Sequence, residues 1–151
     1  MVNRKRSKAN IIISWILMFL WMLFIFYMSQ QNGTESTQKS DFVANLLKYI
    51  GIDGNENVRG IITFIIRKTA HFTEYFILFI LIYRVVTIYF NINNLKYYLS
   101  IIIVFLYACS DEIHQSFIPG RECAFRDVMI DTSGGLIALL FIFIINRIRK
   151  K

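Results

Sequence analysis

The chain has 151 residues, of which 56% are hydrophobic and only 18% are charged, and its mean hydropathy is +0.49. Soluble domains usually carry roughly 25% charged residues, so this composition excludes an ordinary soluble domain and indicates one small membrane domain. The formal net charge of +7 comes from bases beside the apolar runs. Topology and anionic lipid therefore explain it better than a nucleic-acid partner, and we expect no nucleic acid.

The first apolar run extends from Ile11 to about Met28 and follows a basic segment, residues 1–10. Its length is close to the roughly 20 apolar residues that one membrane span needs. A secretory signal peptide would begin in the same way, but the apolar run is long and no small-residue cleavage site follows it. We therefore expect a retained transmembrane helix.

The segment after this run is about 40 residues long and contains no further span. Its first part, Ser29 to Ser40, is rich in Gln, Ser and Thr and is predicted to be irregular. Asp41 is expected to cap a short helix over Phe42 to Ile50, which Gly51 ends. A second amphipathic piece covers about Val58 to Arg67 and leads into the second span. Both pieces are predicted to be short helices that lie on the membrane interface.

Three further apolar runs complete the chain. They cover about Thr69 to Phe90, Leu95 or Tyr97 to Cys109, and Val128 to Ile145. Asn91 to Asn94 predicts a tight turn between the second and third runs. The pattern predicts an all-α, four-helix integral membrane bundle over residues 11–146, followed by a basic tail, residues 147–151.

Charge predicts the orientation of such a bundle, because cytoplasmic segments carry an excess of Lys and Arg. Four spans place both termini on one side. The segments on that side contain ten bases and no acid: Arg4, Lys5, Arg6, Lys8, Arg84, Lys96, Arg147, Arg149, Lys150 and Lys151. The other seven bases and all ten acids fall on the opposite side. We therefore expect a multi-pass protein of the cell membrane with both termini in the cytoplasm.

The first of three polar clusters runs from Arg67 to Tyr75 and opens the second span. His71 and Glu74 are three residues apart, so a helix places them on one face. His71 has the chemistry of an acid/base, a metal ligand or a phosphate contact. The alternative is a His–Glu pair that only locks helices together.

The second cluster, Ser110 to Ser116, follows the third run. Six of its seven residues are polar, and in a helix Asp111 shares a face with His114 or Gln115. Packing alone explains such a segment poorly at the end of a membrane helix. The alternative is an ordinary polar loop.

The third cluster begins at Pro119 and Gly120, which predict a turn that stops the preceding helix. Asp127 and Asp131 then lie four residues apart on one helical face, and Asp131 is a turn inside the fourth span. A buried ion pair with Arg121 or Arg67 is the structural alternative for this acid. Gly134 and Gly135, followed by Ala138, predict a close approach of another helix.

Four spans bring the three clusters to the same outer membrane face, which predicts one polar site there. Its candidate catalytic residues are His71, Glu74, Asp111, Glu112, His114 and Asp131. Its candidate ligand-binding residues are Arg67, Lys68, Gln115, Arg121 and Asp127. No metal or other cofactor is predicted. In one variant His71, Glu74, His114 and Asp131 hold a divalent ion such as zinc or manganese, but their spacing is not a known metal signature. Cys109 and Cys123 are expected to be free thiols.

These clusters carry a family resemblance. The motifs are Tyr27-Met28-Ser29, Arg67-Lys68-x-Ala70-His71-Phe72-x-Glu74-Tyr75, Ser110-Asp111-Glu112-x-His114-Gln115, Pro119-Gly120-Arg121 and Asp127-Val128-x-x-Asp131-x-x-Gly134. In order and separation they resemble the VanZ-like family, from about Phe26 to Ile144. The resemblance implies a bacterial cell-envelope membrane protein, and the founding member is linked to resistance to the glycopeptide teicoplanin. It supplies no established catalytic residues.

Three functions are compatible with these residues. In the first, the outer site binds an envelope lipid, a lipid-linked cell-wall precursor or the antibiotic, with Arg67, Lys68, Arg121 and Arg126 on phosphate or carboxylate. In the second, a membrane hydrolase or transferase uses His71 or His114 as base or nucleophile, oriented by acids. In the third, intramembrane acids serve a channel or proton-coupled transporter, which four spans make least favourable. The oligomeric state is not predicted.

Overall fold

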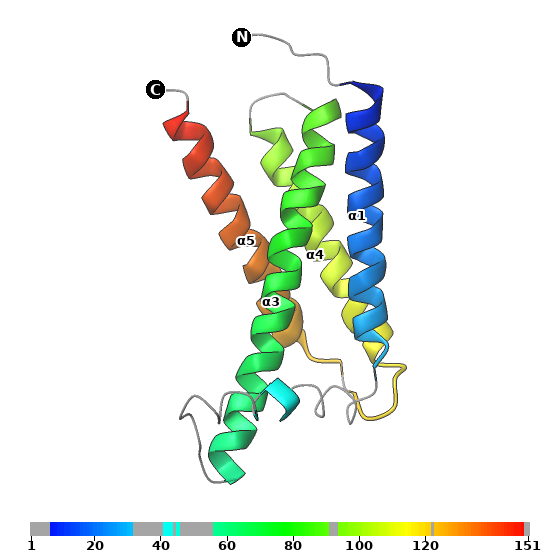
Figure 1. The fold of residues 1–151 in the computed structure, drawn as a ribbon, viewed down its shortest axis with the longest axis vertical. Coiled ribbons are helices and arrows are strands. Elements are labelled where there is room, and N and C mark those ends of the chain that lie inside the picture. The colour runs from blue at the N-terminus through cyan, green and yellow to red at the C-terminus, as the bar shows by residue number, and fades with distance from the viewer. Residues whose placement is uncertain are drawn as a thin grey trace.

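The computed structural model describes residues 7–31, 41–43, 45, 56–90, 94–121 and 123–149. Four long helices account for most of them: α1 (Lys8–Ser29), α3 (Glu56–Tyr89), α4 (Leu95–Gln115) and α5 (Phe125–Ile148). They run alternately up and down, so α1 begins and α5 ends at the same end of the bundle (Figure 1). The predicted all-α bundle is therefore observed.

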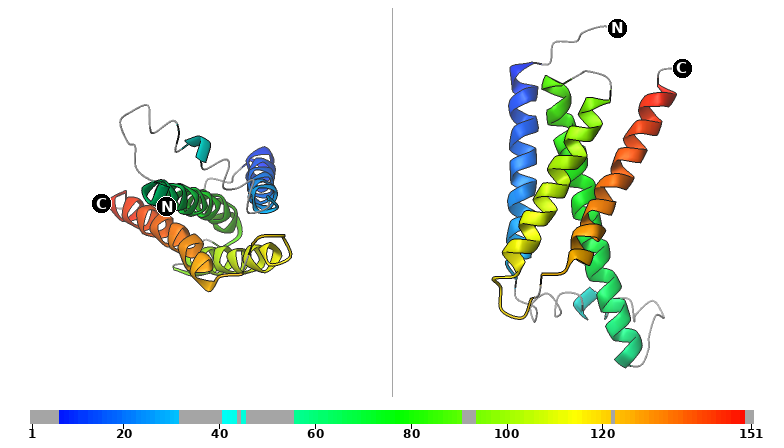
Figure 2. Two further views of the ribbon diagram at one scale, coloured as in Figure 1. Left: turned by 90° about the horizontal axis from the view of Figure 1, so that it is seen from below. Right: turned by 180° about the vertical axis from the view of Figure 1, so that it is seen from behind.

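Three helices have the length and apolar composition of a membrane span: α1, α5 and residues Asn57–Tyr89 of α3. The fourth, α4, is 21 residues long but ends in the polar residues Ser110 to Gln115. It packs against α3 and α5 along the same axis, as Figure 2 shows. The described residues thus contain three candidate membrane spans, whereas α4 as the fourth span and the orientation of the termini stay predictions.

Local sequence explains where α1 and α4 start and stop. The Ser7 side chain caps α1 by accepting a hydrogen bond from the Asn10 backbone N–H at 3.3 Å. The α4 helix ends at Gln115, and Gly120, after the only proline, adopts a φ of 76° that glycine tolerates at little cost. The turn predicted from Pro119 and Gly120 is confirmed.

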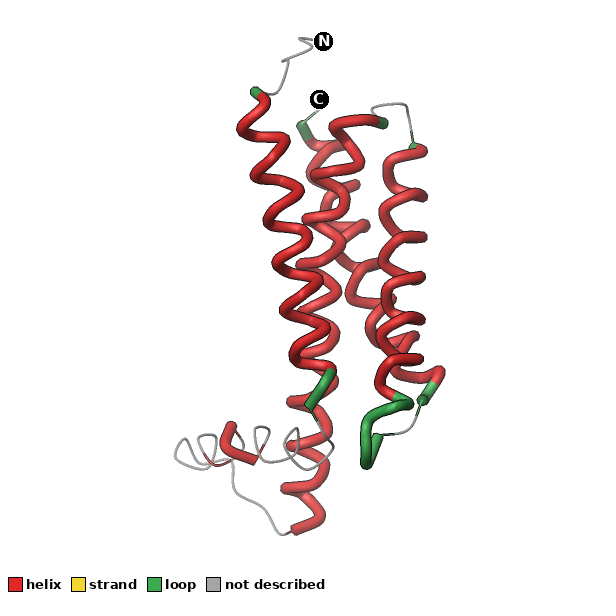
Figure 3. Tube along the Cα trace, turned by 90° about the vertical axis from the view of Figure 1, so that its right-hand side faces the viewer, coloured by secondary structure: helices red, strands yellow, loops and turns green. Residues whose placement is uncertain are grey.

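The helices differ from the predicted runs mainly in length. The amphipathic piece over Val58 to Arg67 is continuous with α3 and projects along its axis beyond the ends of the other helices (Figure 3). The helix predicted over Val58 to Arg67 is therefore observed, but as the first part of α3 rather than as a short helix of its own, and its place on the membrane interface stays a prediction. Residues 41–43 and 45 are helical, and Asp41 accepts a hydrogen bond from Thr63 Oγ1 at 2.9 Å. The turn predicted over Asn91 to Asn94 and the rest of the short helix lie outside the described residues.

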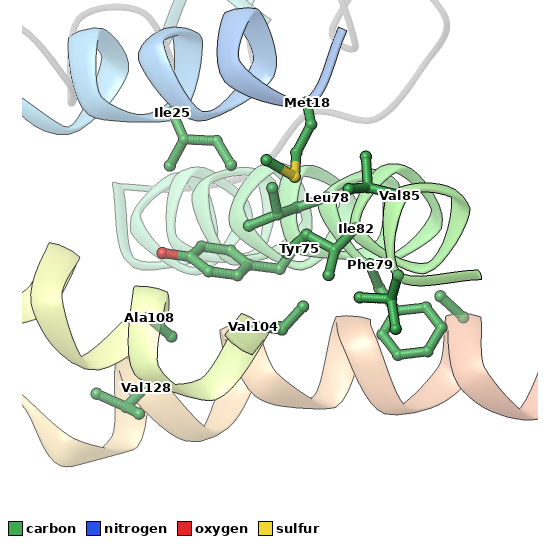
Figure 4. Packing of buried hydrophobic residues seen from close by; sticks show 12 residues of the cluster. Met18, Ile25, Tyr75, Leu78, Phe79, Ile82, Val85, Val104, Ala108 and Val128 are labelled. Carbon is green, nitrogen blue, oxygen red and sulfur yellow. The ribbon is translucent and has the colours of Figure 1, made fainter. Parts of the chain in front are cut away.

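The interior of the bundle is apolar in its middle and polar at one end. A core that includes Tyr75, Leu78, Phe79, Ile82 and Val104 is fully or almost fully buried between the helices (Figure 4). Many large apolar side chains face outward instead, which suits lipid. The buried charged residues Asp111, Glu112 and Asp131 lie at a single end.

Helix α5 crosses α3 and α4 at two consecutive glycines. A Cβ atom added to Gly134 would lie 2.2 Å from the backbone oxygen of Phe72 in α3. A Cβ atom added to Gly135 would lie 2.9 Å from Val104 Cγ1 in α4. Ala138, one turn later, is fully buried. The predicted close helix approach is confirmed, and its partners are α3 and α4 of the same chain.

The opposite end of the bundle is held by aromatic and amide groups. Asn146 Nδ2 of α5 donates to the hydroxyls of Tyr83 and Tyr97 at 3.0 Å each. The rings of Tyr83 and Tyr97 stack with centroids 5.3 Å apart. On α1, Trp15 Nε1 donates to the Tyr89 hydroxyl at 3.0 Å. These bonds connect all four helices away from the polar end and set their relative register.

Candidate functional site

The polar end brings together residues from α3, α4, α5 and the turn between α4 and α5. We call this group the polar cluster. It consists of Arg67, Lys68, His71, Glu74, Tyr75, Asp111, Glu112, Gln115, Arg121, Asp127 and Asp131. Each helix contributes one face, because the members recur at intervals of three or four residues. The three predicted sequence clusters therefore meet in one place.

The face between α3 and α5 contains an ion pair and a histidine between two acids. Lys68 Nζ lies 2.6 Å from Asp127 Oδ2, and both side chains are mostly buried. His71 Nδ1 lies 3.7 Å from Glu74 Oε2 and 3.9 Å from Asp131 Oδ1. Both of the His71 distances exceed a hydrogen bond, so the imidazole faces two carboxylates without a direct bond to either.

On α4, Gln115 joins an acid to a base. Its Nε2 donates to Asp111 Oδ2 at 3.0 Å, and its Oε1 accepts from Arg121 Nη1 at 2.8 Å. The Ser29 hydroxyl at the end of α1 lies beside the same Asp111 carboxylate. Gln115, a predicted ligand contact, therefore bonds within the chain through both ends of its amide and links Arg121 to Asp111.

Glu112 holds the start of α5. Its Oε1 accepts a hydrogen bond from the Ala124 backbone N–H at 2.7 Å, just before the first residue of α5. The Glu112 side chain is 2% exposed, so this bond is made where water does not compete. Glu112 therefore fixes where α5 leaves the turn, which is a structural role that the sequence alone did not reveal.

Arg121 is the one member of the cluster outside the helices. Burial and the neighbouring Arg67 guanidinium lower its pKa, while Asp111, Glu112 and Asp127 raise it. A guanidinium remains charged under all these influences. The turn therefore presents a permanent positive charge to the acids of α4 and α5.

The second histidine lies at the edge of the cluster. The His114 ring contacts the ring of Phe26 in α1, with centroids 4.5 Å apart. His71 instead faces Glu74 and Asp131 on the α3–α5 side. The two histidines thus approach the acids from different helices, and His71 is the one that contacts two carboxylates.

Several buried polar atoms have no hydrogen-bond partner among the described residues. They are Ser29 Oγ, His71 Nδ1, Tyr75 OH, His114 Nδ1, Asp127 Oδ1 and Thr132 Oγ1. Buried polar groups are normally paired, so unpaired ones at a single end call for a reason. Tyr75 is the clearest case, because it is fully buried and its hydroxyl points toward the polar end in Figure 4.

The structural alternative for Asp131 is not observed. Within the described part of the chain, no ion pair joins Asp131 to Arg121 or to Arg67. The charges that act most on Asp131 are all carboxylates, namely Asp111, Asp127, Glu112 and Glu74. A 2% exposed acid surrounded by acids is costly unless something compensates for its charge.

The structure adds Tyr75 and Ser29 to the predicted site residues. Both belong to the family motifs quoted above, but neither carries a charge that would single it out. Trp21 of α1 also contacts the site backbone, since its Nε1 donates to the Glu74 carbonyl at 2.9 Å. The metal variant gains no support: among the residues described, no three His, Cys, Asp or Glu side chains are placed to hold one metal ion.

Comparison with known proteins gives one positive result. The family model described as VanZ/LLP1 matches residues 14–146, which is most of the chain and includes every member of the polar cluster. Comparisons with curated proteins and with solved structures gave no match. The resemblance seen in the sequence motifs is confirmed by this match, and the chain belongs to the VanZ/LLP1 family.

Proposed function

We propose that this protein is a multi-pass envelope protein whose polar cluster faces the outside of the cell and binds the polar part of an envelope lipid or lipid-linked cell-wall precursor. By that binding it contributes to tolerance of glycopeptides such as teicoplanin. Four spans with both termini in the cytoplasm are part of the proposal. At the end of the bundle where α1 begins and α5 ends, the described residues include the bases Lys8, Lys96, Arg147 and Arg149 and no acid.

One observation carries the proposal. Five acids and three bases from three helices and a turn converge at one end of a bundle whose middle is apolar. Stability alone does not favour such a group, because buried ion pairs seldom gain more than well-packed apolar residues. Buried unpaired atoms beside them, such as Tyr75 OH and His71 Nδ1, suit a site that completes its hydrogen bonds with a ligand.

The test compares variants of the cluster with matched controls in a glycopeptide-sensitive bacterial host. The wild type, His71→Gln, Glu74→Gln, Arg121→Gln and Asp131→Asn are expressed, their membrane levels are matched, and teicoplanin and vancomycin susceptibility are measured. Asp41→Asn and Lys96→Gln remove a charge outside the cluster and serve as controls. We expect the wild type and controls to protect against teicoplanin and the cluster variants to lose protection at normal abundance.

Other outcomes count against the proposal in different ways. If the cluster variants disappear from the membrane while the controls remain, the polar residues are structural pairs. If the variants are abundant and still protect fully, the cluster is not the functional site. If the wild type gives no protection against either glycopeptide, the proposed contribution to tolerance is wrong for this chain.

A membrane hydrolase or transferase is the second candidate. The observation in its favour is His71, whose Nδ1 lies 3.7 and 3.9 Å from two carboxylates, since acid–base contacts often tighten only when substrate binds. Catalysis predicts that His71→Gln abolishes function in a folded protein. Binding predicts graded losses that are largest at the bases Arg67, Lys68 and Arg121.

A further inference from the structure

The charges of the polar cluster are sorted by depth. On α3, Arg67 and Lys68 precede His71 by one turn, and Glu74 and Tyr75 follow it. Seven residues of helix separate Lys68 from Tyr75, a distance of about 10 Å along the axis. On α5, Asp127 pairs with Lys68 near the start of the helix, and Asp131 lies about 6 Å further in. The bases of α3 therefore lie at the outer level together with Asp127, and the acids Glu74 and Asp131 lie at the inner level.

The outer level presents cations around an aromatic ring. Lys68 Nζ and Arg126 Cζ lie 5.4 and 5.2 Å from the centroid of the Phe64 ring. Phe64 and Arg126 are exposed, and Arg121 is half-buried next to Arg67. Such a surface suits a phosphate, which accepts charge-assisted hydrogen bonds from Lys and Arg.

The inner level contains acids, whereas the lysine and the arginines described above lie at the outer level. Glu74 and Asp131 lie on either side of His71, 3.7 and 3.9 Å from its Nδ1, and Asp111 is close enough for its charge to act on both acids. Arg121, the guanidinium that acts on Glu74 and Asp111, is already bonded to Gln115. The fully buried Tyr75 hydroxyl lies in the field of the same three acids and has no hydrogen-bond partner in the described part of the chain. An ammonium group would compensate these charges and complete the hydrogen bonds.

We propose that the ligand of the polar cluster is a phosphate ester that carries a primary amine, bound with its phosphate on the outer bases and its ammonium between Glu74, Asp111 and Asp131. This inference deepens the proposed function and rests on it. The chemistry is that of an aminophospholipid headgroup or of a free phosphorylated amine, and the two sources are distinguished experimentally. A ligand with phosphate alone would leave the inner acids uncompensated.

The test uses the full-length protein in detergent and four probes. The first is a short-chain phosphatidylethanolamine, the second is the same lipid with its amine acetylated, the third is phosphatidylglycerol of equal chain length, and the fourth is soluble O-phosphoethanolamine. Binding is measured by native mass spectrometry or thermophoresis. We expect the free amine to raise affinity about tenfold over the acetylated lipid, the scale of one charge-assisted hydrogen bond.

Variants link this preference to the inner acids. Glu74→Gln and Asp131→Asn are expected to remove the preference for the free amine and to leave phosphatidylglycerol binding equal or tighter. Tyr75→Phe is expected to reduce the preference by a few-fold, and Asp41→Asn to leave it unchanged. Thermal unfolding midpoints identify any variant that loses binding because it misfolds. If either Glu74→Gln or Asp131→Asn misfolds, the other variant is used to measure the amine preference.

The outcomes separate this inference from the proposed function. Equal affinity for the amine and its acetylated form, with binding still dependent on Arg121, overturns the inference and leaves the proposed function standing. An amine preference that survives both inner variants also overturns it. Absence of binding to all four probes overturns the inference, whereas the proposed function is tested separately by the glycopeptide susceptibility of the cluster variants. If O-phosphoethanolamine binds as tightly as the lipid, the ligand chemistry is supported and a soluble source replaces the lipid.

Discussion

Pairing within the polar cluster differs from one residue to the next. Lys68 and Asp127 form a short ion pair, Gln115 bridges Asp111 to Arg121, and Glu112 accepts from a backbone N–H. Tyr75 has no hydrogen-bond partner among the described residues, and Asp131 faces the His71 imidazole at 3.9 Å, beyond a hydrogen bond. The paired residues thus build the frame of the cluster, and the underpaired residues are the ones available to a ligand.

The Lys68–Asp127 pair is expected to stabilise the contact between α3 and α5. Lys68→Met leaves Asp127 as a mostly buried, unpaired charge, and Asp127→Asn does the same to Lys68. The double variant removes both charges, so its loss of stability should be smaller than the sum of the single losses. A double-mutant cycle on unfolding in detergent should give a coupling of about 1 kcal/mol or more. Additive losses would contradict a coupled pair.

The Glu112 bond to Ala124 is expected to control local opening at the start of α5. Glu112→Met removes the acceptor, so hydrogen exchange of the Ala124 amide should accelerate at least tenfold, the scale of one lost buried hydrogen bond of about 1.4 kcal/mol. Glu112→Gln keeps an oxygen acceptor and should change the rate only a few-fold. Equal acceleration in both variants would show that charge, rather than the bond, holds this residue.

Sequence reasoning could find the charged members of the cluster because charges stand out among apolar residues. It could not assign their contacts. Gln115 and Glu112 bond within the chain, because the turn from Ser116 to Ala124 folds back onto α4, and this path is not encoded in helical spacing. Tyr75 was missed as a site residue because an aromatic residue in an apolar run is normally part of the core.

At the scale of the helices, the α3–α5 crossing explains how the cluster is assembled. Gly134 brings the α5 backbone against Phe72 O of α3, and this contact lies within a turn of His71 and Asp131. A larger residue would separate the helices at the point where their polar faces meet. The glycine therefore determines the distance between two faces of the site as well as the packing.

Gly134→Ala is expected to destabilise the protein by about 3 kcal/mol or more, because its Cβ would overlap a backbone oxygen that a side-chain rotation cannot move. Gly60→Ala is the matched control, since a Cβ atom there would have nothing within 4 Å. Because Gly60 is exposed and helical, Gly60→Ala should raise the free energy of unfolding by up to about 1 kcal/mol. Unfolding midpoints in detergent check both. Tolerance of alanine at position 134 would refute the crossing geometry.

The number and type of helices could be read from apolar runs, but their ends could not. The α4 helix extends six residues beyond the predicted Cys109, because Ser110 to Gln115 remain helical where polar side chains find partners within the bundle. The α3 helix starts at Glu56, thirteen residues before Thr69, and the glycine in that stretch, Gly60, does not interrupt it. Hydropathy marks the part of a helix in lipid, whereas hydrogen bonding decides where the helix ends.

At the scale of the whole molecule, the proposed orientation in the membrane can be tested by labelling Cys123. Cys123 is exposed, and it lies in the turn beside the polar cluster. With Cys109→Ser as background, a membrane-impermeant maleimide should label Cys123 in intact cells. In a Cys109→Ser, Cys123→Ser background, an Arg149→Cys variant should react with the maleimide only after the cells are permeabilised, because α5 should end in the cytoplasm. The reverse pattern would invert the proposed topology.

The Gly134–Phe72 contact also has a mechanical consequence. Helix α5 is tied to its neighbours at two levels: at this contact, three residues from Asp131, and at Asn146, which bonds to Tyr83 and Tyr97. A force that bends α5 would therefore act on a helix held near both of its ends, and the polar cluster lies beside one of these two fixed points.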